Sequence, residues 1–361
     1  MFIKLAGTAM AVIMASSFAQ ADQWTSGASL NQARGSFGAA VDWDGRIYAI
    51  GGRIATCVGT ITDTVEVFDS GVWSYGPSIS SPRDGIASTG VNGFIYAIGG
   101  SNQIEPLTIV ERLDTTVSGS SWITIAQLNI PRTLPCIAVD DCGRIYAIGG
   151  QTWDPSDTNN TIEAMTSVER YDPARPELGW TLLPWQLNTG RLLAGCVAAE
   201  DGRIFVFGGQ GFTGIGGSGV HLDSYEVFDP SNSAAGWTQF AQPIIGPNSN
   251  QDEATLGADG LVYIAGGWLP GFSNRAVRYD PATDTWEMWD SIQTFRSEHR
   301  LITTKNGEVM VIGGTDVACT AYTLTSTEIL DTNRCDLDID KNGLIDVEDL
   351  LALLGAWGAC P

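Results

Sequence analysis

The segment 338–349, with the sequence DIDKNGLIDVED, places oxygen-bearing residues at the spacing of a calcium-binding loop. Acidic or amide side chains occupy the ligand positions, a glycine stands where such a loop turns sharply, and one residue offers its backbone carbonyl. The expected ligands are Asp338, Asp340, Asn342, Leu344, Asp346 and Asp349. Hard oxygen ligands suit Ca²⁺, so we predict a calcium-binding tail. The alternative is an acidic turn in solvent before a helix.

A second candidate site is a set of arginines, each just before an apolar stretch of a repeated unit. These are Arg34, Arg83, Arg132, Arg191 and Arg296. Exposed around the mouth of a channel, they would form a positive ring able to hold a carboxylate, a sulfate or an acidic sugar. Otherwise, each would donate hydrogen bonds to loop carbonyls and tie neighbouring units together. Recurrence in nearly every unit favours this structural alternative, because a binding residue need not recur.

Residue types suited to catalysis are sparse. The chain has two histidines, His221 and His299, which argues against most multi-histidine metal sites. It has no G-x-S-x-G nucleophile motif. Acidic residues are abundant, so a carboxylate pair for glycoside or epimerase chemistry is kept as an alternative.

The composition narrows the class of protein. The 361 residues are 43% hydrophobic and 17% charged and include 43 glycines, which favours an all-β protein with many tight turns. The formal charge of −22 would repel nucleic-acid phosphates and anionic membrane surfaces. We therefore expect no nucleic-acid partner. We also expect no membrane span, since no later segment resembles a transmembrane helix.

Residues 1–21 have the pattern of an export signal. Lys4 gives a positive start, an apolar run follows at 5–15, and AQA at 19–21 fits the small-residue cleavage rule. We therefore expect a secreted, periplasmic or cell-surface protein after cleavage, in a compartment that permits disulfides.

The candidate residues are positioned by a repeated unit. A strand ending in Gly-Gly recurs about every fifty residues. Its six copies are RIYAIGG (46–52 and 144–150), FIYAIGG (94–100), RIFVFGG (203–209), LVYIAGG (261–267) and EVMVIGG (308–314). Each unit is expected to hold four strands: an apolar strand, the Gly-Gly strand after a tight Asp-Gly or Asn-Gly turn, a strand such as TVEVFD, and a strand with tryptophan. The glycine pair permits positive φ and close approach of a neighbouring backbone.

The sixth unit lacks its own tryptophan strand. Residues 22–37 parallel residues 284–299. We therefore expect the N-terminal strand, with Trp24, to complete the last unit and close a ring, which removes the exposed edges of an open stack.

These units resemble kelch repeats. The resemblance rests on Gly-Gly after an apolar strand, Tyr or Phe before Asp in the third strand and Trp in the fourth, over about residues 22–332. It implies an all-β, six-bladed β-propeller of four-stranded blades. Some exported propellers of this kind act on sialic acids, which gives the enzymatic alternative a fold-level analogy.

The tail at 333–361 resembles half of a dockerin module, with one EF-hand-like calcium loop followed by the short amphipathic segment VEDLLALLGAWG. A dockerin carries two such loops and this chain carries one. Docking to a cohesin-like or surface partner, attachment or sorting, and capping of the propeller are therefore all kept as roles for the tail.

Seven cysteines leave at least one without a partner in the chain. The pairs expected are Cys335–Cys360, which would staple the small tail, and Cys57–Cys319, which would join loops of the first and last blades. Cys136 and Cys196 could face one another on the innermost strands of adjacent blades, or remain free thiols.

Function is expected on one face. In a four-stranded blade, the connections between strands two and three, and those leading to the next blade, emerge together on what we call the long-loop face. The long, irregular connections are 151–166, 210–223, 268–275 and 315–325. They carry Trp153, Phe212, His221, Trp268, Phe272 and Tyr322, and loops on a rigid scaffold are the usual place for binding.

We hypothesise an exported, non-catalytic propeller that binds an extracellular glycan or protein on the long-loop face. A calcium-binding tail would serve attachment or partner docking. The alternative is a carbohydrate-active enzyme, epimerase-like or hydrolase-like, that uses carboxylates and arginine at the channel mouth.

Overall fold

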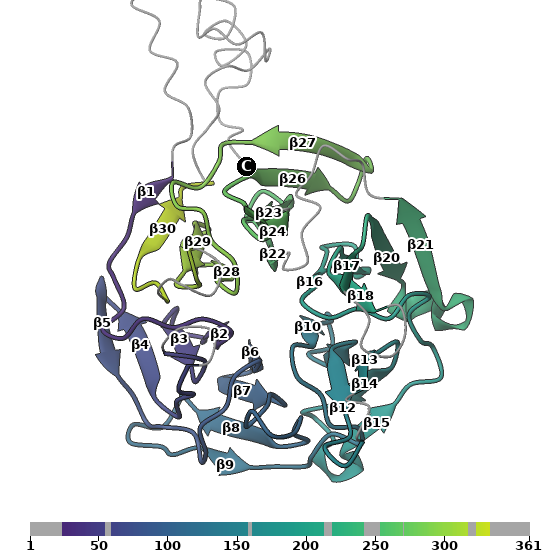
Figure 1. The fold of residues 1–361 in the computed structure, drawn as a ribbon, viewed down its shortest axis with the longest axis horizontal. Coiled ribbons are helices and arrows are strands. Elements are labelled where there is room, and N and C mark those ends of the chain that lie inside the picture. Colours follow the sequence, from purple (N-terminus) through teal and green to yellow (C-terminus); the bar gives the residue numbers. More distant parts are fainter. Residues whose placement is uncertain are drawn as a thin grey trace, which may run out of the picture. The chain divides into compact units, whose positions relative to one another are not determined.

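Six antiparallel sheets of four strands stand as blades around a common centre (Figure 1). The computed structural model describes residues 24–54, 59–157, 161–212, 219–241, 253–269, 271–316 and 323–332. The prediction of an all-β, six-bladed propeller with four-stranded blades is confirmed. Within the described ranges, no helix is long and apolar enough to cross a membrane.

Each blade runs outward from its innermost strand. Blade 1 consists of β2 (Gly38–Val41), β3 (Ile47–Ile50), β4 (Val65–Asp69) and β5 (Val72–Tyr75). Blade 2 consists of β6 (Ala87–Val91), β7 (Phe94–Ile98), β8 (Val110–Asp114) and β9 (Ile123–Thr124). Blade 3 consists of β10 (Cys136–Val139), β11 (Ile145–Ile148), β14 (Val168–Tyr171) and β15 (Trp180–Leu182).

The remaining blades repeat this order. Blade 4 consists of β16 (Gly195–Ala198), β17 (Ile204–Phe207), β20 (Ser224–Phe228) and β21 (Trp237–Ala241). Blade 5 consists of β22 (Glu253–Leu256), β23 (Val262–Ala265), β26 (Ala276–Asp280) and β27 (Thr285–Trp289). Blade 6 consists of β28 (Arg300–Thr303), β29 (Val309–Ile312), β30 (Thr327–Leu330) and β1 (Thr25–Ser26).

Among the described residues, three blades carry an additional hairpin on the long-loop face. These hairpins are β12 (Gln151–Trp153) with β13 (Ile162–Ala164), β18 (Gln210–Phe212) with β19 (Gly219–His221), and β24 (Trp268–Leu269) with β25 (Gly271–Phe272). Two short 3-10 helices, Pro176–Leu178 and Pro230–Ala235, lie between the third and fourth strands of blades 3 and 4. The hairpins of blades 3 and 4 contact one another.

The turn before each Gly-Gly strand explains the tyrosine of the motif. In blade 1, Oδ1 of Asp42 accepts the backbone N–H groups of Asp44 and Arg46, both at 2.9 Å. Its Oδ2 accepts Nε of Arg46 at 2.7 Å and the hydroxyl of Tyr48 at 3.1 Å. One aspartate therefore accepts hydrogen bonds from the N–H groups of the turn and from the buried tyrosine hydroxyl. Buried polar groups need such partners.

The glycine pair has the role that the sequence predicts. Gly51 and Gly52 have φ of 58° and 97°. A Cβ on Gly51 would lie 2.9 Å from the carbonyl oxygen of Arg83, and one on Gly52 would lie 2.8 Å from that of Gly35. Because linkers from two blades pass directly over the pair, only glycine fits both the backbone conformation and the space.

The ring is closed by the N-terminal strand, as predicted. β1 pairs antiparallel with β30, with Thr25 opposite Ile329 and Ser26 opposite Glu328. Trp24 is 2% exposed, and its indole N–H donates to the carbonyl of Asp290, just beyond β27, at 2.8 Å. The first described residues therefore hold the last blade against blade 5.

The hydrophobic core lies between blades. The described residues form six buried apolar clusters, and each cluster draws on two neighbouring blades. Tryptophans in or directly before the outermost strands add hydrogen bonds between blades. The indole N–H groups of Trp73 and Trp122 donate to the carbonyls of Ala28 and Pro77 at 3.0 and 2.8 Å. Each of these acceptors lies just beyond the outermost strand of the preceding blade.

A chain of backbone hydrogen bonds runs around the channel mouth on the long-loop face. Its members are Glu298, Ser36, Gly85, Leu134 and Leu193, each with φ between 49° and 63°. The N–H of each of the last four donates to the carbonyl of the equivalent residue in the preceding blade, at 2.7–3.4 Å. This mouth belt connects blades 6, 1, 2, 3 and 4 through main-chain atoms alone.

Candidate functional site

The five linker arginines are buried, so the possibility of a positive ring at the channel mouth is corrected. Their side chains are 0–1% exposed, and each forms an ion pair with a buried glutamate of the third strand in its blade. The pairs are Arg34–Glu66, Arg83–Glu111, Arg132–Glu169, Arg191–Glu226 and Arg296–Glu328, at 2.6–2.9 Å. A guanidinium that is enclosed by its own blade cannot reach a ligand, so these residues hold the fold together.

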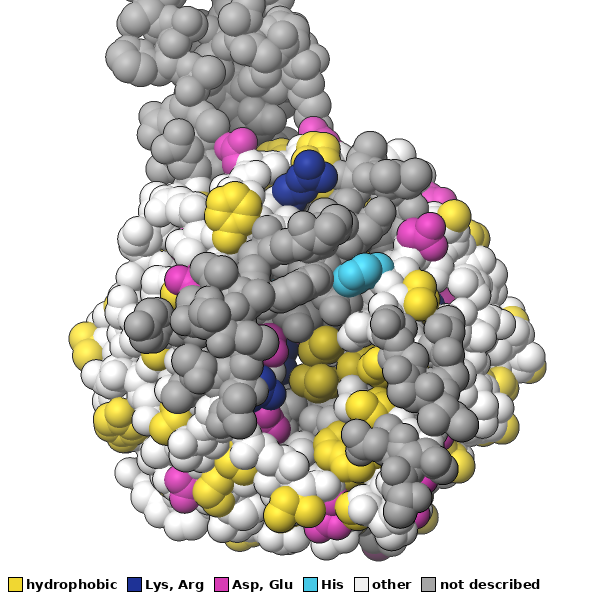
Figure 2. Space-filling model, viewed as in Figure 1, with side chains coloured by type: hydrophobic (Ala, Val, Ile, Leu, Met, Phe, Trp, Pro, Cys, Tyr) yellow, Lys and Arg dark blue, Asp and Glu magenta, His cyan; other side chains and the backbone are white. Residues whose placement is uncertain are grey.

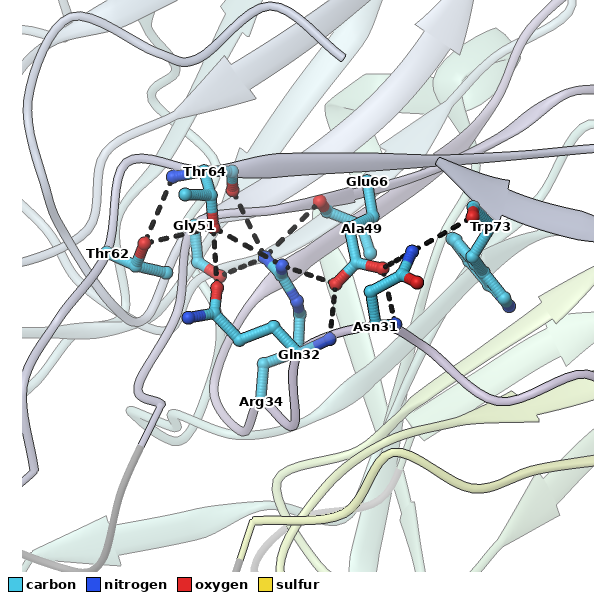
Figure 3. Close-up of polar contacts among 9 residues, drawn as sticks. All are labelled: Asn31, Gln32, Arg34, Ala49, Gly51, Thr62, Thr64, Glu66 and Trp73. Carbon is cyan, nitrogen blue, oxygen red and sulfur yellow. Dashed lines mark hydrogen bonds and ion pairs between the residues drawn. The ribbon is translucent and has the colours of Figure 1, made fainter. Parts of the chain in front are cut away.

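Figure 3 shows one of these nodes, around Arg34. Nη1 of Arg34 donates to the carbonyls of Gly51 and Thr64, and Nη2 donates to Oε1 of Glu66. The same carboxylate accepts the backbone N–H groups of Asn31 and Gln32 at 2.7 and 3.0 Å. The node therefore fixes the linker that arrives from blade 6 onto the third strand of blade 1.

The pKa values reflect this enclosure. Burial lowers the pKa of Arg132, and the Glu169 carboxylate acts in the opposite direction. Blade 5 lacks both partners, because Val277 stands at the glutamate position and Ser249 or Asn250 at the arginine position. Loss of the two together is what a buried ion pair predicts, since either charge alone would be left unpaired.

The hairpins carry three of the other candidate residues whose side chains are described. Trp153 is half-buried on β12, Phe212 is half-buried on β18, and His221 is exposed on β19. The backbones of Trp268 and Phe272 pair with each other in the β24–β25 hairpin. The indole N–H of Trp153 donates to the carbonyl of Ile104 at 3.1 Å, which connects the blade 3 hairpin to a loop of blade 2.

Several predicted sites lie outside the described residues. These are the export signal at 1–21, the calcium ligands Asp338, Asp340, Asn342, Leu344, Asp346 and Asp349, the residue Tyr322, the side chains of Trp268 and Phe272, and the cysteines Cys57, Cys319, Cys335 and Cys360. In the part of the chain that is described, no three His, Cys, Asp or Glu side chains group so that they could hold a metal ion.

Sequence reasoning missed a set of variable positions around the mouth. In the five blades with a linker arginine, the residue after the Gly-Gly pair forms a backbone bridge with the residue after that arginine. The bridged pairs are Arg53 with Gly35, Ser101 with Asp84, Gln151 with Thr133, Gln210 with Leu192, and Thr315 with Ser297. Their types change from blade to blade while the flanking residues repeat, and this contrast was the signal available in the sequence.

The bridged residues of blades 1 to 3 other than Gly35 line a cavity of about 500 Å³ on the long-loop face. Its polar lining includes Arg53, Asp84, Gln103 and Gln151, and Trp153 supplies an aromatic side chain. Figure 2 shows a hollow at the centre of the ring, with acidic and basic side chains along one side and hydrophobic side chains along the other. The volume falls within the range of small-ligand sites, and the lining is mostly polar.

Arg53, in contrast to the linker arginines, is only half-buried. Its Nη2 lies 2.6 Å from Oδ2 of Asp84, and its Nη1 lies 3.8 Å from Oε1 of Glu298. Although burial acts to lower it, the pKa of Arg53 is raised by these two carboxylates. Two carboxylates and one guanidinium therefore meet at the channel mouth.

The channel below the mouth forms a second cavity, of about 310 Å³. Arg300 and Glu253, from the innermost strands of blades 6 and 5, form an ion pair in its wall. Cys136 and Cys196 form a disulfide between β10 and β16, with their Cα atoms 5.7 Å apart. Of the two alternatives for these cysteines, the structure therefore has the pair facing one another.

Comparison with protein families supports the repeat assignment. A family model for the Kelch motif matches residues 34–80 and 254–288. These ranges fall in blades 1 and 5, and the same four-stranded unit recurs in the other four blades. The chain thus contains kelch repeats, as the Gly-Gly and tryptophan spacing predicts.

Three curated relatives share parts of this ring. Kelch repeat and BTB domain-containing protein 12 of Danio rerio is 28% identical over 245 residues, covering 62% of this chain and 37% of the relative. Kelch repeat and BTB domain-containing protein 13 of Homo sapiens is 34% identical over 106 residues, covering 29% and 22%. N-acetylneuraminate epimerase of Yersinia enterocolitica is 24% identical over 204 residues, covering 56% and 45%. The matches therefore span less than half the length of these relatives.

Proposed function

We propose that this propeller of kelch repeats is an exported, non-catalytic binding protein whose long-loop face holds a glycan or another protein. The observation that carries the proposal is the 500 Å³ cavity at the foot of the β12–β13 hairpin. Half of its ten lining residues come from the bridged positions that vary between otherwise repeating blades, and a binding surface needs such variation. A kelch propeller fits non-catalytic binding, and the buried arginines leave the scaffold rigid beneath the cavity.

The test is a pull-down with the purified propeller and tail against soluble polysaccharides, insoluble polysaccharides and cell-surface extracts. Gln151→Trp should fill the cavity and abolish capture of the bound material. The same replacement at Gln239, an exposed residue of the outer strand β21, should leave capture unchanged. Equal capture by both variants would place binding elsewhere, and no capture by the unmodified protein would remove the basis of the proposal.

We propose in addition that the tail binds Ca²⁺ through the loop 338–349 and serves attachment or docking to a cohesin-like or surface partner. The support is the spacing of Asp338, Asp340 and Asn342 before Gly343, with the acidic residue Asp349 at the end of the loop. Isothermal titration with CaCl₂ should give one site per chain. Asp338→Ala with Asp349→Ala should abolish it, whereas the exposed propeller variant Asp69→Ala should not.

A second candidate function is a carbohydrate-active enzyme. It is favoured by Asp84 and Glu298 on either side of Arg53 and by the similarity to N-acetylneuraminate epimerase. Turnover of neutral and acidic sugars can be followed by NMR. Activity that is abolished by Asp84→Asn and retained in Asp69→Asn would replace the binding proposal with this one.

A further inference from the structure

The charges around the mouth cavity argue against an anionic ligand. Arg53 is its basic lining residue, and it is already engaged by Asp84 through Nε at 3.1 Å and Nη2 at 2.6 Å. Glu298 adds a second carboxylate 3.8 Å from the remaining edge of the guanidinium. One cation thus stands between two anions in a chain of formal charge −22, and a carboxylate or sulfate entering here would meet a negative field.

The neutral polar groups of the cavity both donate and accept hydrogen bonds. They are the hydroxyls of Ser101 and Thr133 and the carboxamides of Gln103 and Gln151. Gln103 is held in place, because its Nε2 donates to the carbonyl of Gly59 at 2.8 Å and its backbone N–H donates to Oγ of Ser101 at 2.9 Å. Hydroxyl groups of a ligand also donate and accept, so they match this lining where a simple ion would not.

The aromatic wall is fixed before any ligand arrives. The indole N–H of Trp153 is bonded to the carbonyl of Ile104, which restricts rotation of the ring. The side chain is half-buried and lines the same cavity as the amides. A flat ring held at one edge offers an apolar face without further loss of side-chain freedom on binding. A pyranose ring has the complementary form, with C–H groups on its faces and hydroxyls around its rim.

From these three features we infer that the cavity binds a neutral sugar residue of a glycan, stacked on Trp153 with its hydroxyls toward Gln151, Gln103 and Asp84. The inference rests on the proposed function and narrows it to one class of ligand. Asp84 contributes as an acceptor through its second oxygen, and its charge is balanced by Arg53. The acidic sugars that an exposed arginine ring would have selected are disfavoured.

The probes are cellohexaose, laminarihexaose, xylohexaose and mannohexaose, compared with hexagalacturonate, sialyllactose and a heparin hexasaccharide. Binding is measured by isothermal titration and by saturation-transfer NMR on the full chain. At least one neutral hexasaccharide should bind, and the acidic probes should bind at least tenfold more weakly or not at all. Saturation should reach the C–H protons of the neutral sugar that binds.

The chain offers a matched control for the aromatic wall. Trp153→Ala should weaken the Kd about tenfold or more, as expected for an aromatic anchor. Trp43→Ala removes a tryptophan that is 76% exposed in the turn between β2 and β3, and should change the Kd less than twofold. Trp153→Phe should restore part of the affinity. Thermal unfolding of each variant checks that the fold is intact.

The outcomes separate the inference from the proposed function. Binding of acidic probes alone, or neutral-glycan binding that Trp153→Ala leaves unchanged, would overturn the inference. Capture of a protein that Gln151→Trp abolishes, with no glycan bound, would also overturn it while supporting the proposed function. Absence of any ligand from extracts and from the probe panel would remove both.

Discussion

In each of five blades, a single glutamate accepts a hydrogen bond from the linker arginine and fixes the linker that arrives from the preceding blade. Glu169 is typical: Oε1 accepts Nη2 of Arg132 at 2.9 Å, and Oε2 accepts the backbone N–H of Asn129 at 2.7 Å. Both charged side chains are fully buried. One carboxylate thus balances the charge of the arginine and also accepts the backbone N–H groups of the linker. If either partner is removed, the other remains buried without its counter-charge, which is energetically costly.

Glu169→Gln should lower the free energy of unfolding by about 3–5 kcal/mol, because Arg132 is left buried without its counter-charge. Urea unfolding monitored by tryptophan fluorescence measures the change. Glu287→Gln breaks an ion pair with Arg278 in which the glutamate is 53% exposed, and should cost about 1 kcal/mol or less. Equal effects of the two variants would contradict the structural role of the node.

His299 makes stability depend on pH. Burial first, and then the neighbouring charges of Arg296 and Arg300, lower the pKa of His299 to about 3. An unfolded histidine titrates near pH 6.5, so between these values the unfolded chain binds more protons than the folded protein. The contribution of the neutral imidazole to stability is therefore complete above about pH 6.5 and is lost as the pH falls toward 3.

His299→Phe places at this position the residue that blade 1 has there, Phe37. Between pH 7 and pH 5 the unmodified protein should lose about 2 kcal/mol more of its unfolding free energy than the variant does. Urea unfolding at the two pH values measures the difference. Parallel losses in both proteins would show that His299 titrates normally in the fold.

At the scale of elements, the innermost strands of blades 3 and 4 are joined covalently. The disulfide between Cys136 on β10 and Cys196 on β16 spans 60 residues of sequence. Its largest effect is expected on the unfolded chain, where it closes a long loop. The two blades it joins also share one apolar cluster, so the bond reinforces a contact that packing already makes.

The double change Cys136→Ala and Cys196→Ala should lower the free energy of unfolding by about 4 kcal/mol on the chain-entropy model for a loop of this length. Thermal unfolding with and without reductant measures the effect. Reductant should destabilise the unmodified protein more than the double variant, in which any remaining effect would come from the other predicted pairs, Cys57–Cys319 and Cys335–Cys360. Cys142→Ala, at an exposed free thiol, is the control and should behave as the unmodified protein does.

Much of the element order was predictable from the sequence, because equivalent positions in the blades carry the same residue types and pack in the same way. The tight turn at Asp42, the glycines at 51 and 52 and the pairing of the N-terminal strand follow from repetition alone. The mouth was not predictable in the same way. Repetition directed attention to Arg34 and its equivalents, whereas Arg53 and Asp84 carry no recurring pattern and are brought together only by the closed ring.

At the scale of the whole molecule, the described ring has no separate core within any blade. Each of its six apolar clusters needs two neighbours, so stability depends on closure between β1 and β30 as much as on any sheet. Trp24 contributes strongly to closure, because its side chain is buried against blade 5 while the adjoining strand β1 pairs within blade 6.

Trp24→Ala should lower the free energy of unfolding by about 3–5 kcal/mol, because it leaves a cavity and opens the end of the ring. Trp43→Ala should change it by about 0.5 kcal/mol or less, since that side chain is exposed. Chemical denaturation of the two variants makes the comparison. Similar values would show that the N-terminal strand is dispensable for the fold.

The mouth belt has a consequence for how this face can change over time. Its donors and acceptors are main-chain atoms, so the Cα positions around the opening do not depend on which side chains they carry. Ser36, Leu134 and Glu298 already differ in size, polarity and charge within one left-handed conformation. A lineage of such proteins can therefore acquire a new specificity through single codon changes at fixed coordinates, with no insertion and no remodelled loop.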